Sequence, residues 1–450
     1  MHNGKEFLVF SFNWLKKKLV EYKWFIIFFI PFLFFQLYQI SLMRWDTIPY
    51  IFQGKWFCGQ QVYLELIRPP VAGFFSCLFG AQDFSFLLST ALACFLYLFA
   101  LILFYSKNKE NLDQLILALF ALLFPFILFS SNFGSDLFAL AFLLLALVVE
   151  KPWKKGFFLA LASLSRYNFI LFGLIILWSL RKKIKSIPVF VLAFIIPWIP
   201  WMVFNYIYSG NPLFSLSETI YLNVVAKPSF EQFSFEQILL ILIFSMSLIL
   251  VKSKKILSDL KNQSSILLIG QLFFSAIKEM RFFVLLVPSI AFNLSFVSAK
   301  NRVLKIIFLS FFGLICLIVF SPFINNPAGY LNVAFGKDSV ANDDFLHQCR
   351  VASDKWVLFY PNGIVAQYLP IEKIPEYLNK GIIIVWYSYA GNDLNKYSAD
   401  VIYRKDYVIL KPTKCLPPAK SYISGSWSYT VFRWLKDTNS SILDWNEWYE

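Results

Sequence analysis

Charged residues are scarce in this sequence, and the shortage excludes most classes of soluble protein. Only 15% of the 450 residues are Asp, Glu, Lys or Arg, whereas soluble domains average about 25%. By contrast, 58% of the residues are hydrophobic and 20% are aromatic, with 53 phenylalanines among them. A soluble enzyme, a disulfide scaffold, a collagen-like chain and a disordered tail are excluded. The composition is that of a membrane protein that crosses the bilayer several times.

Histidine and the common nucleotide-binding motifs are also nearly absent. The only histidines are His2 and His347, and neither has a second type of metal ligand at useful spacing. The six cysteines form no CxxC pair, and the sequence contains neither GxxxxGK[ST] nor GxGxxG. No motif therefore predicts a zinc site, and a nucleotide-driven pump is disfavoured.

The net charge of +14 does not indicate nucleic-acid binding, because of where it lies. The C-terminal segment 323–450 contains 13 basic and 13 acidic side chains, so the whole excess falls in the apolar segment 1–322. Basic cytoplasmic loops between membrane spans produce such an excess. We therefore expect membrane lipids as partners, and no nucleic acid.

Apolar runs long enough to cross a bilayer follow one another through the segment 1–322. A basic cluster at 16–18 precedes the first run and no cleavage site follows it, which places residues 1–23 in the cytoplasm. The predicted spans are 24–43, 84–106, 111–131, 136–150, 187–208, 235–251, 263–277, 282–299 and 303–322. When the basic loops stay inside, the external segments are 44–83, 132–135, 209–234, 278–281 and 323–450.

The segment 156–180 lies between two basic loops that both belong in the cytoplasm. It is too short to cross twice, because each span needs about 20 residues. We predict two short helices that enter the membrane and return, with Arg166, Tyr167 and Asn168 near the bend. The alternative is one ordinary span that violates the charge rule. The first domain, 1–322, is then an all-α membrane domain with about eleven membrane segments.

The segment 323–450 changes character and predicts a separate extracytoplasmic α/β domain. Short strand patterns occur at Lys355–Tyr360, Gly381–Ser388 and Asp406–Lys411, and a helical stretch occurs at Ile371–Asn379. Alternation of strands with helical stretches is typical of a small α/β domain. The whole chain is therefore predicted to be an integral protein of the cell membrane, with a cytoplasmic N-terminus and an external C-terminal domain.

Five of the six cysteines fall into two groups. Cys349 and Cys415 both lie in the C-terminal domain, and an oxidising location would allow them to form a disulfide. Cys77, Cys94 and Cys316 lie in apolar runs, where a cysteine most simply packs as a small core residue.

The first external loop carries the most informative residues. Asp46 lies just past a membrane exit, Tyr50 follows at four residues, and Arg68-Pro69-Pro70 opens the next apolar run. A carboxylate at a membrane surface, walled by aromatic rings, is placed to take a proton from a hydroxyl. For an isolated Asp, a solvated loop residue is the commoner interpretation.

The spacing of this loop resembles that of polyprenyl-phosphate-sugar-dependent glycosyltransferases of the GT-C superfold. Their first external loop has an acidic residue, Tyr, Gly, and then a basic or polar residue before Pro-Pro. The resemblance implies that Asp46 is the catalytic base, supported by Tyr50 and Arg68. Two further stretches resemble the same superfamily. The first, Leu161 to Arg166, is similar to a small-residue run that ends in Lys or Arg. Residues 278–288 look like an element of eukaryotic mannosyltransferases, with Ile277 in place of its His.

Three cations are candidates for binding a lipid phosphate. Lys278 and Arg281, beside Glu279, lie between two spans with almost no loop, a depth at which ionisable residues are usually paired or functional. They either hold a phosphate or lie at the interface as a snorkelling pair with a salt bridge to Glu279. Arg166, at the predicted bend, needs an anion if it is buried. That anion is a lipid phosphate, or else Asp136 or Glu279 from another helix.

Asp136 opens a predicted span directly after Ser135. An acid at this place caps the helix and complements its dipole. The superfamily also has an acidic residue near its second external loop, so the resemblance implies a catalytic or acceptor-orienting role as the alternative.

Family members that transfer monosaccharides imply that no cofactor is required. Members that transfer oligosaccharides use a divalent cation, so a metal at Asp46 and Asp136 stays open.

A last external segment, 209–234, predicts a turn at Gly210 to Phe214 followed by an interfacial helix that carries Glu218. Its aromatic and polar side chains either contact an acceptor or belong to the aromatic belt at the membrane surface.

The resemblance as a whole implies an inverting, mannosyltransferase-like hexosyltransferase. It would move a sugar from a polyprenyl- or dolichyl-phosphate carrier to a hydroxyl of a glycan, lipid or protein at the external face. A lipid-linked glycan transporter or flippase is the alternative, and a non-catalytic assembly factor is a third.

Overall fold

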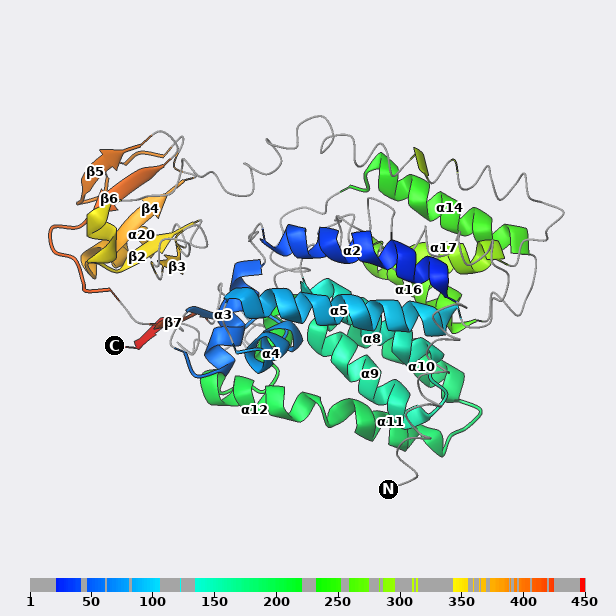
Figure 1. Ribbon diagram of the computed structural model, residues 1–450. Helices are drawn as coiled ribbons and strands as arrows, with labels where there is room; N and C mark the ends of the chain where they lie inside the picture. Colours follow the sequence, from blue (N-terminus) through cyan, green and yellow to red (C-terminus); the bar gives the residue numbers. More distant parts are fainter. Residues whose placement is uncertain are drawn as a thin grey trace, which may run out of the picture. The chain divides into compact units, whose positions relative to one another are not determined.

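A computed structural model describes the chain in a series of segments (Figure 1). These are residues 22–41, 47–60, 63–80, 83–105, 122, 134–220, 232–251, 259–274, 283, 286–295, 310, 313–314, 343–354, 359, 364, 366–369, 373–387, 389, 392–394, 396–404, 407–418, 421–424 and 446–449. The chain divides into two compact units. The first comprises residues 1–39, 90–198 and 227–325, and the second comprises 40–89, 199–226 and 326–450. The predicted domain boundary at 322/323 stays a prediction.

The first unit is built from apolar helices. Their bounds are α2 Lys23–Ser41, α5 Asp83–Phe104, α8 Gly134–Val148, α9 Pro152–Ser165, η2 Tyr167–Leu171, α10 Phe172–Leu180, α11 Ser186–Ile195, α14 Phe235–Val251, α16 Leu260–Phe274 and α17 Leu286–Ser295. Residues 40–41 of α2 and 83–89 of α5 belong to the second unit. Helix α8 is apolar on every side beyond its first turn and is buried from Ser135 to Leu147. A helix that is hydrophobic all round belongs in the middle of a bundle, and α9 packs against it.

Small residues bring α9 close to its other neighbour, α11. A Cβ atom at Gly156 would collide with the backbone carbonyl of Phe190, so only glycine fits there. Further along, the indole Nε1 of Trp198 donates a hydrogen bond of 3.1 Å to the hydroxyl of Ser163. Close approach at small residues combined with hydroxyl hydrogen bonds is how helices associate in membranes. The small-residue run before Arg166 therefore has a packing role.

The two short helices predicted within 156–180 are confirmed, although the first begins earlier, at Pro152. Helix α9 ends at Ser165 because Arg166 is extended, with φ −151° and ψ 116°. A Cβ built on Gly173 would stand 3.3 Å from Cδ2 of Leu159, so these positions are in contact. Arg166 lies midway between them in the sequence. Contact between them shows that the chain reverses its direction around Arg166.

Among the described helices, one is long and apolar enough to cross a membrane alone: Phe84–Phe104. The pair Ser186–Ile195 and Trp198–Ser209 qualifies together as a broken span. Shorter apolar helices occur at Lys23–Leu37, Ser135–Val148, Tyr167–Leu180 and Gln237–Ile249. The predicted span 111–131, except for residue 122, and most of 303–322 fall outside the described residues. The count of about eleven membrane segments therefore stays a prediction.

The predicted external loop 44–83 is a folded part of the second unit, with α3 Thr47–Phe57, β1 Tyr63–Glu65 and α4 Val71–Leu78. Two glycines let α3 and α4 approach closely. A Cβ at Gly54 would stand 2.8 Å from Cβ of Ser76, and one at Gly73 would stand 2.8 Å from Cγ of Gln53. This packing holds α3 and α4 together.

A disulfide between Cys58 and Cys77 joins the C-terminal end of α4 to the residue that follows α3, with the Cα atoms 5.4 Å apart. The prediction of Cys77 as a simple core residue is therefore wrong, because the pairing of α3 with α4 brings a second cysteine to it. Cys94 is buried and free, as predicted. Cys349 and Cys415, for which the sequence left a disulfide open, are joined by one. Cys316 lies outside the described residues.

The second unit also contains α12 Trp198–Ser209, of which all but the first residue belongs to it, and α13 Phe214–Ile220. The turn between them uses Gly210, whose φ is +65°. The side-chain oxygen of Asn211 accepts a hydrogen bond from the N–H of Leu213 at 2.9 Å. A glycine with positive φ and an Asn that bonds two residues ahead are typical of a turn before a helix. The predicted turn and short helix are therefore confirmed.

The C-terminal part of the second unit is a mixed five-stranded sheet of order β3-β2-β4-β6-β5. Its strands are β2 Val351–Ser353, β3 Ala366–Tyr368, β4 Ile383–Trp386, β5 Asp400–Tyr403 and β6 Val408–Lys411, with α20 Ile374–Asn379. Strand β2 pairs in parallel with β3 and β4, and the remaining pairs are antiparallel. The central strands β2 and β4 are buried on both faces. Hydrophobic clusters therefore cover both sides of the sheet.

Two of the three predicted strands are confirmed by β4 and β6, and the predicted helix by α20. The predicted strand Lys355–Tyr360 falls outside the described residues except for Phe359, and β2 lies just before it. A second sheet of order β1-β7-β8 was not predicted. In it, β7 Ser421–Ser424 pairs in parallel with β1 and antiparallel with β8 Asn446–Tyr449. The C-terminal segment is therefore tied to the strand that follows α3.

Candidate functional site

Four of the predicted site residues lie outside the described part of the chain: Asp46, Lys278, Glu279 and Arg281. Their proposed roles stay predictions. Asp46 directly precedes α3, which is buried from Thr47 to Gly54 without interruption. Pro49 lies in the first turn of this helix, where a missing N–H breaks no helical hydrogen bond. The helix that follows Asp46 in the sequence is therefore buried over its first two turns.

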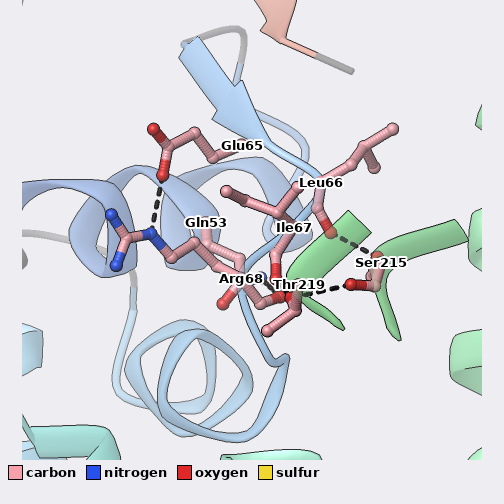
Figure 2. Close-up of polar contacts among 7 residues, drawn as sticks. All are labelled: Gln53, Glu65, Leu66, Ile67, Arg68, Ser215 and Thr219. Carbon is pink, nitrogen blue, oxygen red and sulfur yellow. Dashed lines mark hydrogen bonds and ion pairs between the residues drawn. The ribbon is translucent and has the colours of Figure 1, made fainter. Parts of the chain in front are cut away.

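Arg68 lies in the short connection between β1 and α4, and its side chain contacts Glu65 (Figure 2) and Tyr50. Its Nε donates a hydrogen bond of 2.6 Å to a carboxylate oxygen of Glu65, forming an ion pair. Its guanidinium also stands 5.8 Å from the ring centre of Tyr50, within the range of a cation–π contact. The predicted supporting residues Tyr50 and Arg68 are therefore brought together, with Glu65 as an additional partner.

The backbone of this connection is anchored from both sides. On one side, Nε2 of Gln53 in α3 donates a hydrogen bond of 2.9 Å to the carbonyl of Arg68. On the other side, α13 supplies two hydroxyls. Ser215 Oγ donates to the carbonyl of Leu66, and Thr219 Oγ1 donates to that of Ile67 at 3.2 Å (Figure 2). Three side chains thus fix the position from which Arg68 extends.

Glu218 of α13 is the one ionisable residue of this helix, and it is completely buried, with 0% of its side chain exposed. Neither of its carboxyl oxygens has a hydrogen-bond partner within the described structure. Burial raises the pKa of Glu218 to about 8, because the charged form loses its hydration. The carboxyl is therefore neutral at pH 7.

Arg166 and Asp136 meet in the first unit, where the arginine at the helix break forms an ion pair with the aspartate in the first turn of α8. The arginine side chain is 22% exposed and the aspartate 9%. Of the anions considered for Arg166 from the sequence, the structure supplies Asp136. Asp136 thus has an ion pair in addition to its favourable place in the first turn of α8. The contact does not test a catalytic role of Asp136 or a donor-binding role of Arg166.

Sequence reasoning did not find Glu65 or the contact of α13 with residues 66 and 67. The ion pair of Glu65 with Arg68 has an i, i+3 spacing, which the sequence displays. The anchoring by α13 joins segments far apart in the chain, and no local pattern signals it. Among the described residues, no three His, Cys, Asp or Glu side chains converge as metal ligands. A cation at Asp46 and Asp136 therefore stays only a sequence-based hypothesis.

The fold of this chain is similar to that of a solved structure, ArnT from Cupriavidus metallidurans bound to undecaprenyl phosphate. It matches with a TM-score of 0.59 and 12% identity, over 86% of this chain and 98% of ArnT. The apo state of ArnT matches with a TM-score of 0.57 and 12% identity, over 86% of this chain and 97% of ArnT. No family model and no curated protein matches the sequence.

Proposed function

We propose that this protein transfers a sugar from a polyprenyl-phosphate carrier to an acceptor hydroxyl at the external face of the cell membrane. The observation that carries the proposal is the fold shared with nearly the full length of ArnT, a protein whose structure holds undecaprenyl phosphate. The loop motif of Asp46, Tyr50 and Arg68 supports it independently, because the motif depends on residue spacing and not on the fold. The identity of the sugar and of the acceptor is not part of the proposal.

The two disulfides support an external location for the second unit. Cys58–Cys77 lies in the site loop and Cys349–Cys415 in the C-terminal domain. Stable disulfides form in oxidising compartments and are rare in the cytoplasm. The charge pattern of the loops predicts the same side for both segments. Two unrelated lines of reasoning therefore agree on the orientation.

The proposed reaction is a single displacement with inversion. The acceptor oxygen forms a bond to the anomeric carbon as the bond from that carbon to the phosphate oxygen breaks, and the electron pair leaves with the phosphate. Asp46 takes the proton of the acceptor hydroxyl. Arg166, with Lys278 or Arg281, would offset the charge that develops on the leaving phosphate. One carboxylate is sufficient, in contrast to retaining glycoside hydrolysis, which needs two.

Arg68 is suited to a supporting role in this reaction. A guanidinium has five N–H donors, and the contact with Glu65 that is described uses its Nε. The anchoring by Gln53, Ser215 and Thr219 fixes the backbone on which it sits. An arginine held in this manner can orient an anion without losing much conformational entropy on binding.

The experiment is sugar transfer in proteoliposomes with a panel of radiolabelled undecaprenyl-phosphate sugars and an extract of membrane acceptors. The purified wild type is compared with Asp46→Asn, and with Asp400→Asn as a matched control on the exposed edge strand β5. We expect transfer by the wild type and the control, and a loss of at least about 100-fold in Asp46→Asn, since a general base contributes that much or more. Equal transfer by all three proteins would remove Asp46 from the mechanism.

The alternative function, a lipid-linked glycan flippase, also uses broken helices and intramembrane charges. The bent pair of α11 and α12 and the reversal at Arg166 are compatible with it. The same proteoliposomes separate the two functions. Movement of labelled lipid across the bilayer without transfer would favour the flippase, and neither activity, with folded protein, would favour a non-catalytic assembly factor.

A further inference from the structure

Basic side chains gather around the helices α9, α10 and α11 of the first unit, in a region that the proposed reaction does not use. Between Glu150 and Glu218 the sequence contains no Asp or Glu. The same stretch contains eight cations, of which Arg166 is paired with Asp136. The other seven lie beside or within the first turn of α9 and in the loop between α10 and α11: Lys151, Lys154, Lys155, Arg181, Lys182, Lys183 and Lys185.

The packing of α9 against α11 brings these cations to one end of the helices. Gly156, near the start of α9, lies against the backbone of Phe190 in the first half of α11. Ser163, near the end of α9, accepts a hydrogen bond from Trp198, just past the end of α11. The two helices therefore run parallel, and the residues that open α9 lie at the same end as the loop that opens α11. Helix α10 ends in that loop, so the seven cations share one end of the three helices.

The cations of this end keep most of their charge uncompensated. Lys155 is buried and donates from Nζ to the carbonyl of Ala146 at 3.3 Å. The acid next to them in the sequence is Glu150, directly before Lys151. Within the described part of the chain, none of the seven forms an ion pair with a carboxylate. Five of them are exposed: Lys151, Arg181, Lys182, Lys183 and Lys185.

An exposed apolar row on α10 leads directly to this charge. Leu174 and Trp178 are 62% and 61% exposed, and positions i and i+4 share one side of a helix. Arg181 continues the row three residues later, and its guanidinium stands 3.9 Å from the ring centre of Trp178. A second exposed apolar row begins one turn after Lys185 on α11 and consists of Val189, Leu192 and Ile196.

An apolar surface that ends in a cationic one fits an amphiphile with apolar tails and an anionic head. Lys and Arg form charge-assisted hydrogen bonds with phosphate oxygens, and clusters of about four to eight such residues beside membrane helices attract anionic lipids. Tryptophan is enriched at the level of the lipid head groups. The positive-inside rule explains the number of cations. It does not require the two basic segments to meet, or Arg181 to lie on an exposed Trp178 at the end of an apolar row.

We propose that the loop 181–185, together with Lys151 and Lys154, binds the phosphate of an anionic phospholipid whose acyl chains lie along the exposed rows of α10 and α11. The lipid belongs to the cytoplasmic leaflet, where the charge pattern places both basic segments and where anionic lipids create a negative surface potential. Both ends of the α9–α10 hairpin meet this surface, so the bound lipid holds the hairpin that carries Arg166. The inference rests on the membrane location of the chain and goes beyond the proposed sugar transfer.

The test measures lipid binding by native mass spectrometry of the full-length protein in neutral detergent. We expect wild type to bind phosphatidylglycerol at least about tenfold more tightly than phosphatidylcholine, since only the former has a net charge. Changing Lys182, Lys183 and Lys185 together to Gln should raise the Kd for phosphatidylglycerol about 100-fold, because each cation near the surface contributes about fivefold. Changing the same three residues to Arg keeps the charge and should keep the wild-type Kd.

A matched control removes three exposed lysines from the C-terminal domain: Lys380, Lys396 and Lys414. Its Kd should stay within about threefold of wild type, because these lysines lie in the second unit. An equal rise in Kd in the control, or an unchanged Kd in the loop variant, would overturn the inference. So would a wild type that binds both phospholipids equally.

Two further arms keep the test decisive. If the triple Gln variant does not fold, Arg181→Gln replaces it. A rise of about fivefold in the Kd for phosphatidylglycerol supports the inference, and an unchanged Kd overturns it. Undecaprenyl phosphate is titrated in parallel, and a greater dependence of its binding on the three lysines would assign the surface to the sugar carrier and overturn the phospholipid assignment. Sugar transfer is not measured, so failure of the proposed function leaves this test intact.

Discussion

Replacing Glu218 with Gln is expected to stabilise the protein, and the gain is expected to grow with pH. The folded protein keeps the proton of Glu218 up to about pH 8, whereas the ordinary value for a glutamate is 4.5. Because the folded state binds the proton more tightly than the unfolded state, stability is full below pH 4.5 and falls as the pH rises toward 8. Glutamine cannot ionise in either state, so it does not incur this loss.

The magnitude follows from the same pKa. One pKa unit corresponds to about 1.4 kcal/mol, so the rise from 4.5 to about 8 corresponds to roughly 5 kcal/mol above pH 8. At pH 7 the loss in wild type is roughly 3 kcal/mol. The amide of Gln occupies nearly the same volume as the carboxyl, so packing is preserved.

Thermal unfolding in detergent micelles, followed by intrinsic fluorescence, measures the effect. Between about pH 5 and about pH 9, the Tm of Glu218→Gln should rise relative to wild type by several degrees. Ser217→Ala, one position away and also buried, should show a Tm difference that does not depend on pH. A constant Tm difference between Glu218→Gln and wild type across this range would show that Glu218 has an ordinary pKa, and would refute the argument.

Three further changes test other parts of the structure. Arg166→Leu leaves Asp136 buried without the arginine and should destabilise the protein by about 3–5 kcal/mol, measured as a lowered Tm. Adding Asp136→Leu should restore most of the lost stability. A double variant as unstable as Arg166→Leu would contradict the pairing. Gly54→Ala forces a Cβ to within 2.8 Å of Ser76 and should cost about 1–3 kcal/mol, whereas an unchanged Tm would contradict the close packing of α3. Cys58→Ser removes a disulfide that closes a loop with a sequence separation of 19, and should lower the stability by about 3 kcal/mol. Alkylation of a free thiol at Cys58 in the oxidised wild type would disprove the disulfide.

The parts of the fold that the sequence predicts are those governed by local pattern. Apolar runs predict α2, α5, α8 and α14 because burial in lipid or in a bundle demands continuous hydrophobicity. The break at Arg166 follows from chain length, since the stretch between the two basic loops is too short to span twice. Strands β4 and β6 follow from short β-branched runs. In each example the determining residues are neighbours in the sequence.

The parts that it does not predict depend on distant segments. Strand β1 is very short and pairs with β7, near the other end of the chain, so no local pattern marks either strand. Cys77 looks like an apolar core residue until α3 and α4 are packed, and only then does Cys58 become its partner. The site shows the same division. Spacing alone makes Asp46, Tyr50 and Arg68 candidates, whereas the support of Arg68 by Ser215 and Thr219 requires the fold.

The electrostatics of the candidate site have a consequence for leaving-group stabilisation. The two described arginines that the sequence assigns to the site each have a carboxylate partner, Glu65 for Arg68 and Asp136 for Arg166. Each pair is close to neutral, so neither arginine offers a full positive charge to a phosphate. An ion-paired guanidinium still has N–H groups to donate, and its partner keeps it in one orientation. In the proposed reaction, Arg166 would therefore act through its N–H groups while it stays paired with Asp136, and Lys278 or Arg281 would supply the additional positive charge.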